Sequence, residues 1–435
     1  MEGILYSARK TIVNYVKACN PLIVATVLAL IVANIPAVNG YYFSLWEQEI
    51  RLQIGGFNLF GHGGHAMNLM QFINDALMAV FFFTIGLEIK REILVGELSS
   101  IKQALLPIVA AVGGMAVLVL IFFAMSVGTD YSRGAAIPMA TDIAFSLGVL
   151  SMLGNRVPAS LKIFLTTLAV VDDIGGILVI ALFYSSGIEI SYLLYSLAAI
   201  VLLCLGSVLK VQSKIFYLLL GGVVWYLFLN SGVHATIAGV IVAFCIPAKP
   251  VFKPKKYISI IRSSISHFPV EEGKDGGHES DKANILTKGQ MNLLKQIESA
   301  SDKVISPLQE LEDSLHPVVN YLIIPIFAFA NAGIFLGDMS FSDISEGVGI
   351  AVICGLLFGK FAGIFSFTWL AVKLGIAPMP DGSDWKMISA VSMLGGIGFT
   401  VSLFIANLSF PDAAHAGLLN APSWGYWPAR CFLGC

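Results

Sequence analysis

Charged residues are scarce in this chain. Only 12% of its 435 residues are Asp, Glu, Lys or Arg, whereas soluble domains carry about 25%. Apolar residues make up 57%, and the mean hydropathy is +0.81. This composition excludes an ordinary soluble protein. It predicts an all-α polytopic membrane protein, because a membrane β-barrel would show short alternating segments in place of long apolar runs.

The chain also has no large surplus of positive or negative charge, since its formal net charge is −2. We therefore expect no nucleic-acid partner. The cysteines are few and scattered, which excludes a disulfide framework or a cysteine metal site; they are Cys19, Cys204, Cys245, Cys354, Cys431 and Cys435. A convincing signal-peptide cleavage site is absent as well, so we expect an uncleaved first helix.

Long apolar runs are what the chain has in abundance. A helix needs about 20 mostly apolar residues to cross a bilayer. Such runs predict spans at Pro21–Val38, Leu69–Ile89, Ala104–Met125, Gly134–Leu153, Ala159–Tyr184, Ser191–Leu209, Ile215–Leu229, Val233–Ile246, Val318–Leu336, Gly349–Leu370 and Ile388–Leu408. Lys and Arg gather on one side of these spans, and the positive-inside rule places that side, with the N-terminus, in the cytoplasm.

Two segments between the spans differ from the rest. Apolar and polar residues alternate at the start of residues 47–60 and are followed by Gly55-Gly56, which predicts a small extracytoplasmic β-hairpin; a folded-back solvent loop fits equally well. Residues 248–313 hold charges of both signs and predict a long cytoplasmic loop, part of which has the spacing of an amphipathic surface helix. This loop separates transmembrane residues 1–247 from 314–421 and leaves a tail at 422–435.

The predicted span Ala159–Tyr184 contains two adjacent acids, Asp172 and Asp173, near its middle. Each would cost about 2.5–3.5 kcal/mol at the centre of an inserted helix. The acids must therefore face water, an ion or a partner. One alternative is that Asp172 only neutralises Lys360, the cation inside the predicted span Gly349–Leu370. An intramembrane aspartyl protease would need a GxGD-type motif, which DDIGG does not supply, so we do not expect an enzyme.

Two predicted spans are interrupted near the middle of the membrane. Pro138 removes a helical hydrogen bond just before Thr141 and Asp142, and glycines interrupt the last span at Gly395–Thr400. Paired interrupted helices in corresponding halves indicate a transporter built from inverted repeats, with its site at the bilayer midplane. The sequence thus predicts about 11–12 transmembrane helices, two of which are broken near mid-membrane.

Carboxylates at such a site bind either a hard cation or a proton. Hard oxygens suit Na⁺ or Li⁺, and two adjacent buried acids resist double ionisation. A proton and a cation would then compete for one site, and alternating access would convert that competition into exchange. Two alternatives stay open at this point: a sodium-coupled symporter of an organic anion, and a non-transporting membrane scaffold or receptor that uses the large loop.

Several stretches together resemble the NhaA-type sodium/proton antiporters. They are INDALMAVFF, GLEIKRE, AIPMATDIAFSLGVL, LKIFLTTLAVVDDIGG, SGVHATIAGV, PIFAFANAG and GIGFTVS, and the likeness runs from about residue 15 to about residue 420 without the loop. The resemblance implies a multi-pass protein of the bacterial inner membrane that exchanges Na⁺ or Li⁺ for a larger number of protons. It implies that the two broken helices cross near mid-membrane. It also implies pH regulation, a homodimer formed through the hairpin, and no cofactor beyond the transported ions.

The resemblance also implies roles for individual residues. It assigns Asp172 and Asp173 to cation and proton binding, with Thr141 as a further cation ligand. Asp142 and Lys360 would compensate the charged ends of the broken helices, and Lys360 would pair with Asp172 when sodium is absent. Asp75 would be a supporting intramembrane acid. The implied pH-sensing residues are Glu88, Glu92, His234, Glu312 and His316.

The chain departs from the family pattern in three places. The loop between the eighth and ninth spans is unusually long, and Phe361 stands where a proline commonly follows the lysine. The tail PSWGYWPARCFLGC has no helical period and is too short to span. We interpret Pro422–Cys435 as a frameshifted reading of a twelfth helix, since a neighbouring reading frame allows an apolar sequence rich in small residues. Sequencing the coding DNA would test this interpretation.

Overall fold

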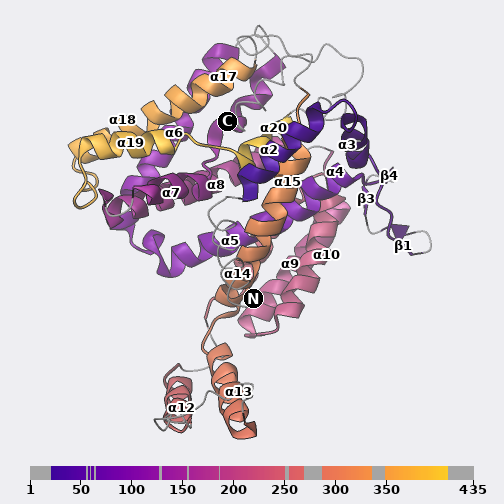
Figure 1. Cartoon of the computed structure of the whole chain (residues 1–435), viewed down its shortest axis with the longest axis vertical. Coiled ribbons are helices and arrows are strands. Elements are labelled where there is room, and N and C mark those ends of the chain that lie inside the picture. The colour runs from indigo at the N-terminus through magenta and orange to yellow at the C-terminus, as the bar shows by residue number, and fades with distance from the viewer. Residues whose placement is uncertain are drawn as a thin grey trace, which may run out of the picture.

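The computed structural model describes residues 21–54, 57–58, 60–62, 65–126, 130–153, 156–185, 187–249, 254–268, 287–335 and 348–409. The interpretation of residues 422–435 therefore falls outside the described residues. Nearly all of the described chain is helical, as the composition predicts. The helices form an irregular bundle, and the pair α12 (Pro254–Ser266) and α13 (Lys288–Asp302) projects from one end of it (Figure 1).

Within the described part of the chain, six helices are long and apolar enough to cross a membrane: Leu69–Val95, Ile101–Ser126, Ala159–Phe183, Ile190–Val208, Pro307–Asn331 and Ile350–Lys373. The helices α2 (Pro21–Asn34) and α3 (Asn39–Trp46) meet at 117° and count as a seventh span if they are taken together. The prediction of an all-α polytopic membrane protein is thus confirmed. Three shorter apolar helices are α10 (Lys214–Leu229), α11 (Thr236–Cys245) and α20 (Thr400–Ser409).

Of the six, α6 (Ile101–Ser126), α8 (Ala159–Phe183) and α9 (Ile190–Val208) are regular α-helices. The other three each contain a π-helical turn. They are α4 (Leu69–Phe72), η1 (Ile73–Leu77) and α5 (Met78–Val95); α14 (Pro307–Val318), η5 (Val319–Ile323) and α15 (Ile324–Asn331); and α17 (Val348–Cys354), η6 (Gly355–Lys360) and α18 (Phe361–Lys373). Such turns often mark functional sites. Here η1 contains Asp75, and η6 ends at Lys360.

The predicted loop at 248–313 contains two of the described helices. One face of α12 packs against α13, and the Lys303 ammonium lies 5.5 Å from the centre of the Tyr257 ring. The helix α14 already begins at Pro307, with Ser306 as its N-cap, so the predicted loop end at residue 313 falls inside a helix. Glu312 and His316 are therefore held on a regular helical face.

The described residues in the region of the predicted hairpin form short strands. Strand β1 (Gln53–Ile54) pairs antiparallel with β2 (Phe57–Asn58), and β3 (Gly61–His62) pairs with β4 (His65–Ala66). Each strand has two residues, which is shorter than the alternation at 49–54 predicts.

A short 3₁₀ segment, η2 (Glu97–Ser99), follows α5.

Glycines allow the closest helix pairs to form. A Cβ added at Gly239 of α11 would lie 2.3 Å from the Ala79 carbonyl oxygen of α5, and one added at Gly363 of α18 would lie 2.3 Å from the Gly113 carbonyl oxygen of α6. Small residues allow the backbones of membrane helices to approach in this way. The pairs α5–α11 and α6–α18 are thus closely packed, and the segment at 130–139 packs against α6.

Both predicted interruptions are present, and they cross. Three residues separate the 3₁₀ segment η3 (Asp130–Met139) from α7 (Ile143–Met152), and five residues separate α19 (Trp385–Leu394) from α20. The Asp142 amide donates to the Ile397 carbonyl oxygen at 2.8 Å, and the Ser146 hydroxyl donates to the Leu394 carbonyl oxygen at 3.0 Å. Each broken segment thus satisfies backbone groups that the other leaves open, as buried backbone requires.

Substitution of Gly398 by alanine should separate the two breaks. The added methyl would lie 2.4 Å from the Ala140 carbonyl oxygen, so the backbones would have to move apart. We expect a loss of about 1–3 kcal/mol in stability, seen as a lower midpoint of thermal unfolding in detergent. Gly148→Ala is the matched control because Gly148 lies in helix α7 with open space around it. Equal midpoints for the two variants would show that the crossing is not tightly packed.

Candidate functional site

A buried ion pair lies where the broken segments meet helix α8. The Lys360 ammonium lies 2.9 Å from Oδ2 of Asp172, and both side chains are completely buried. The same ammonium donates to the Thr141 hydroxyl at 2.7 Å and to the Met139 carbonyl oxygen. Its three protons therefore have three acceptors, which fixes the lysine at the break in the first interrupted helix.

Thr141 connects this ion pair to the second broken helix. Its hydroxyl oxygen lies 2.7 Å from Oδ2 of Asp172 and 2.8 Å from the Gly395 carbonyl oxygen. A hydroxyl has one proton to donate, so it serves one of these two acceptors at a time. The Thr141 oxygen thus lies among a carboxylate, a carbonyl and an ammonium, and a small shift of any of them changes its partner.

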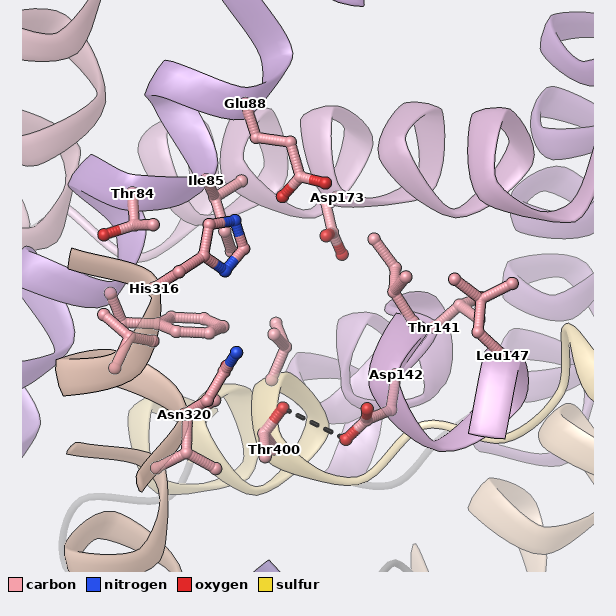
Figure 2. A pocket seen from close by; sticks show the side chains of 15 residues that line it. Thr84, Ile85, Glu88, Thr141, Asp142, Leu147, Asp173, His316, Asn320 and Thr400 are labelled. Carbon is pink, nitrogen blue, oxygen red and sulfur yellow. Dashed lines mark hydrogen bonds between the residues drawn. The ribbon is translucent and has the colours of Figure 1, made fainter. Parts of the chain in front are cut away.

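Asp173 faces a different environment from its neighbour. Its side chain borders a cavity of about 310 Å³ and is 6% exposed, whereas the cavity lining includes neither Asp172 nor Lys360. In Figure 2, Glu88 and Asp173 lie close together on one side of the cavity, Thr141 lies next to Asp173, and Asp142 lies on the opposite side near Thr400. Oδ1 of Asp173 is buried without a hydrogen-bond partner among the described residues. Of the two adjacent acids, Asp173 is therefore the one that a cation or proton in the cavity meets first.

The charges at the crossing match the helix ends beside them. Lys360 contacts the carbonyl end of η3, where the helix dipole is negative. Asp142 directly precedes α7, and the Thr400 hydroxyl at the start of α20 lies 3.4 Å from Oδ2 of Asp142, with the pair drawn in Figure 2. Amino-terminal helix ends carry partial positive charge, so this placement is favourable for an acid.

Comparison of the sequence with known proteins identifies the family of this chain. A family described as Na⁺/H⁺ antiporter 1 matches residues 10–423. The chain belongs to this family. A relative from Phocaeicola vulgatus, named Na(+)/H(+) antiporter NhaA, is 59% identical over 388 residues, which is 89% of this chain and 84% of the relative.

Two further relatives carry the same name. One from Bacteroides fragilis is 56% identical over 406 residues, covering 93% of this chain and 90% of its own length. One from Parabacteroides distasonis is 49% identical over 433 residues, covering 99% and 94%. The likeness thus extends across the whole transmembrane region, and the resemblance seen in the sequence motifs is confirmed.

In this antiporter family member, four of the predicted pH-sensing residues gather near one end of the cavity. Arg91 lies 2.9 Å from a Glu92 oxygen and 3.3 Å from a Glu312 oxygen. His316 follows Glu312 by one helical turn, with Nε2 at 3.9 Å from Oε1 of Glu312. Glu88 and His316 themselves border the cavity (Figure 2). The acids of α5 and α14 thus surround one arginine close to where the cavity meets Asp173.

The fifth predicted sensor lies elsewhere. His234 pairs with the acid of the π-turn η1, with Nε2 at 3.7 Å from Oδ1 of Asp75, and its Nδ1 lies 2.8 Å from the Thr236 hydroxyl. Its ring packs edge-on against Phe404 at 5.4 Å. Neither Asp75 nor His234 borders the cavity. Their placement fits a structural pair that joins α11 to η1, so the pH-sensing role of His234 remains a prediction.

The sequence motifs did not single out two polar residues of the cavity. Asn320, in the π-turn η5, and Thr400, at the start of α20, both line it (Figure 2). Thr400 marked the end of the GGIGFT interruption, which was the available signal, whereas an asparagine one turn after His316 gave none. Among the described residues, no three His, Cys, Asp or Glu side chains lie close enough to hold a metal ion.

Removal of the Thr141 hydroxyl should weaken exchange without abolishing it. In Thr141→Ala, Asp172 keeps Lys360 and a water molecule can replace the neutral oxygen. We expect a higher apparent KM for Na⁺ and a smaller change in maximal rate. Thr141→Ser, which keeps the hydroxyl, should stay close to wild type. A serine variant as impaired as the alanine variant would assign Thr141 a packing role.

Proposed function

We propose that this protein exports Na⁺ or Li⁺ from the cytoplasm in exchange for protons, by alternating access to one buried site. The observation that supports this most strongly is the Asp173 carboxylate. It borders a cavity at the crossing of two broken helices, with one oxygen that has no partner among the described residues. The relatives named above are called Na⁺/H⁺ antiporters, and nothing in those names favours a symporter or a scaffold.

Competition between proton and cation follows from the chemistry of these groups. Na⁺ and Li⁺ require several oxygen ligands to replace their water, and Asp173, Thr141 and nearby carbonyl oxygens supply them. A protonated carboxylic acid is a poor cation ligand, so cation binding requires the proton to leave. Asp172 adds a second negative oxygen if it releases Lys360, to which it is bound at 2.9 Å. The arrangement with Lys360 bound corresponds to the sodium-free state.

This exchange moves net charge. If both Asp172 and Asp173 change protonation when one cation enters or leaves, more protons move inward than cations move outward. The proton gradient and the membrane potential would then both drive export. No resident cofactor is needed, because the transported ions are the only chemistry at the site.

Orientation and assembly complete the proposal. Lys90, Lys210 and Lys249 lie at the end of the spans where the cavity meets Glu88, so we place that end and the N-terminus in the cytoplasm. The bilayer is that of a bacterial inner membrane. We also propose a homodimer formed through the segment at 47–60, whose short strands have edges that can pair with a second copy.

Everted membrane vesicles test the exchange directly. After respiration acidifies the interior, added NaCl or LiCl should collapse the pH gradient, and KCl should not. The same vesicles without the protein provide the baseline. If neither Na⁺ nor Li⁺ has an effect from about pH 6 to pH 9, with the protein shown to be folded, the antiport proposal fails; a response that requires an organic anion would favour the symporter.

Neutralising Glu88 and Glu312 together should shift the pH profile of exchange more than its maximal rate. Glu88 adds negative charge beside Asp173 in the cavity lining, and Glu312 adds negative charge behind it, where its carboxylate lies 3.3 Å from Arg91. Negative neighbours make a carboxyl hold its proton more strongly, so their removal lets the site release its proton at lower pH. The vesicle assay on Glu88→Gln/Glu312→Gln should show activation at lower pH. Glu97→Gln, which lies beyond the end of α5, is the control; an unchanged profile in the double variant would contradict a sensing role.

A further inference from the structure

Two cysteines lie in contact outside the transport site. Sγ of Cys204, on α9, lies 3.5 Å from Sγ of Cys245, the last residue of α11, and both thiols are free. They are separated by 41 positions in the chain. We propose that Cys204 and Cys245 form a redox-active dithiol that a two-electron thiol oxidant converts reversibly into a disulfide joining α9 to α11.

The geometry favours closure of this bond. A disulfide needs its sulfurs about 2.05 Å apart, so they must approach by roughly 1.5 Å from their present contact. The helices run parallel because α10 returns the chain between them, and α9 and α10 lie side by side in Figure 1. Both cysteines lie near the carboxyl ends of their helices, at the same side of the bundle.

The two thiols have different access and a shared cation. Cys204 is exposed and Cys245 is buried, so an oxidant meets Cys204 first and Cys245 resolves the adduct. Lys90 lies within electrostatic range of both thiols, and its ammonium donates to the Phe244 carbonyl oxygen at 2.7 Å and to the Ile246 carbonyl oxygen, on either side of Cys245. Lys90 thus places a positive charge beside Cys245, whose burial otherwise opposes the thiolate that attacks.

The reaction balances with a diazene oxidant such as diamide. One thiolate adds to the N=N bond, and the second thiolate displaces the nitrogen and forms the S–S bond. The two thiols lose two electrons and two protons, and the diazene gains them as a hydrazine. A dithiol such as dithiothreitol reverses the bond by exchange.

The disulfide would lie inside one packed unit. Cys245 belongs to a hydrophobic cluster with Leu203 of α9, Tyr217 of α10 and Leu87 of α5. Among the side chains that the structure describes, none of the cluster's buried residues comes from η3, α7, α19 or α20. Rearrangement of the broken helices would therefore not need α9 to move relative to α11. We expect oxidation to leave exchange largely intact and to stabilise the protein.

The experiment uses the full-length protein in membrane vesicles treated with diamide. Peptide mapping without reduction should find Cys204 linked to Cys245, and dithiothreitol should release both. In Cys204→Ser, Cys245 should stay available for alkylation after unfolding, whereas Cys354→Ser, which removes a third cysteine, should keep the link. Both thiols still free in the oxidised wild type, or an oxidant adduct on Cys204 alone, would overturn the proposal.

The rate of exchange in the same vesicles tests whether α9 and α11 stay fixed relative to each other during transport. We expect the rate after diamide to stay within twofold of the untreated rate, and to match that of Cys204→Ser treated in the same way. A loss of exchange that dithiothreitol reverses in wild type but that is absent in Cys204→Ser would show that α9 and α11 move during transport. That result would contradict the expectation that α9 and α11 stay fixed relative to each other during transport. The proposed disulfide itself would still be supported.

Discussion

Asp173→Asn should abolish Na⁺/H⁺ exchange. The amide keeps the size of the side chain but carries neither a negative charge nor a proton to release, and Asp173 is the buried acid that borders the cavity. We expect the pH response to NaCl and LiCl in everted vesicles to fall to the level of vesicles without the protein. Isothermal calorimetry on the purified variant should show no cation binding.

A matched control separates loss of charge from loss of folding. Asp381→Asn makes the same chemical change at an exposed turn residue and should exchange normally. Both variants should unfold near the wild-type temperature, since the change at Asp173 removes a charge that lacks a partner at Oδ1 among the described residues. Cation binding at wild-type strength by Asp173→Asn would remove this residue from the site.

Helical geometry explains why the two adjacent acids have separate environments. Consecutive residues of an α-helix point about 100° apart, so Asp172 and Asp173 cannot both face the same partner. In the structure Lys360 forms an ion pair with Asp172, and Asp173 borders the cavity. The alternative that Asp172 only neutralises Lys360 therefore describes its contacts in this state. It does not extend to Asp173.

The interruptions were predictable because their causes are local. Pro138 cannot donate a helical hydrogen bond, and the glycines at 395–398 weaken a helix wherever they occur. The contacts between the breaks were not predictable, since the Asp142 amide and the Ile397 carbonyl oxygen are distant in the chain. The sequence therefore indicated where backbone groups become free, and packing determined how they are satisfied.

Other features left no mark on the sequence. The π-turns η1 and η6 lie in apolar runs whose pattern suits a regular helix equally well, so Asp75 and Lys360 were predicted without the local backbone that positions them. The cysteines looked too scattered to pair, yet the parallel packing of α9 and α11 brings Cys204 and Cys245 into contact. Pairings of this kind depend on the tertiary arrangement alone.

Lys360→Ala should produce the largest loss of stability among these variants. The substitution leaves the Asp172 carboxylate without its ion-pair partner and the Met139 carbonyl oxygen without its ammonium donor. The side chains of Lys360 and Asp172 are both fully buried. Breaking a buried ion pair by removing one partner costs about 3–5 kcal/mol. We expect a clearly lower midpoint of thermal unfolding in detergent, and a pH profile for exchange that differs from wild type.

A double variant tests whether the unpaired Asp172 charge causes the loss of stability in Lys360→Ala. Lys360→Ala/Asp172→Asn removes both charges, so it should unfold at a higher temperature than Lys360→Ala alone, although neither should exchange normally. Lys386→Ala, an exposed lysine in α19, should unfold at the wild-type temperature. If the double variant is no more stable than the single one, the lysine stabilises the crossing through its bonds to Met139 and Thr141, and the pairing with Asp172 contributes little to the fold.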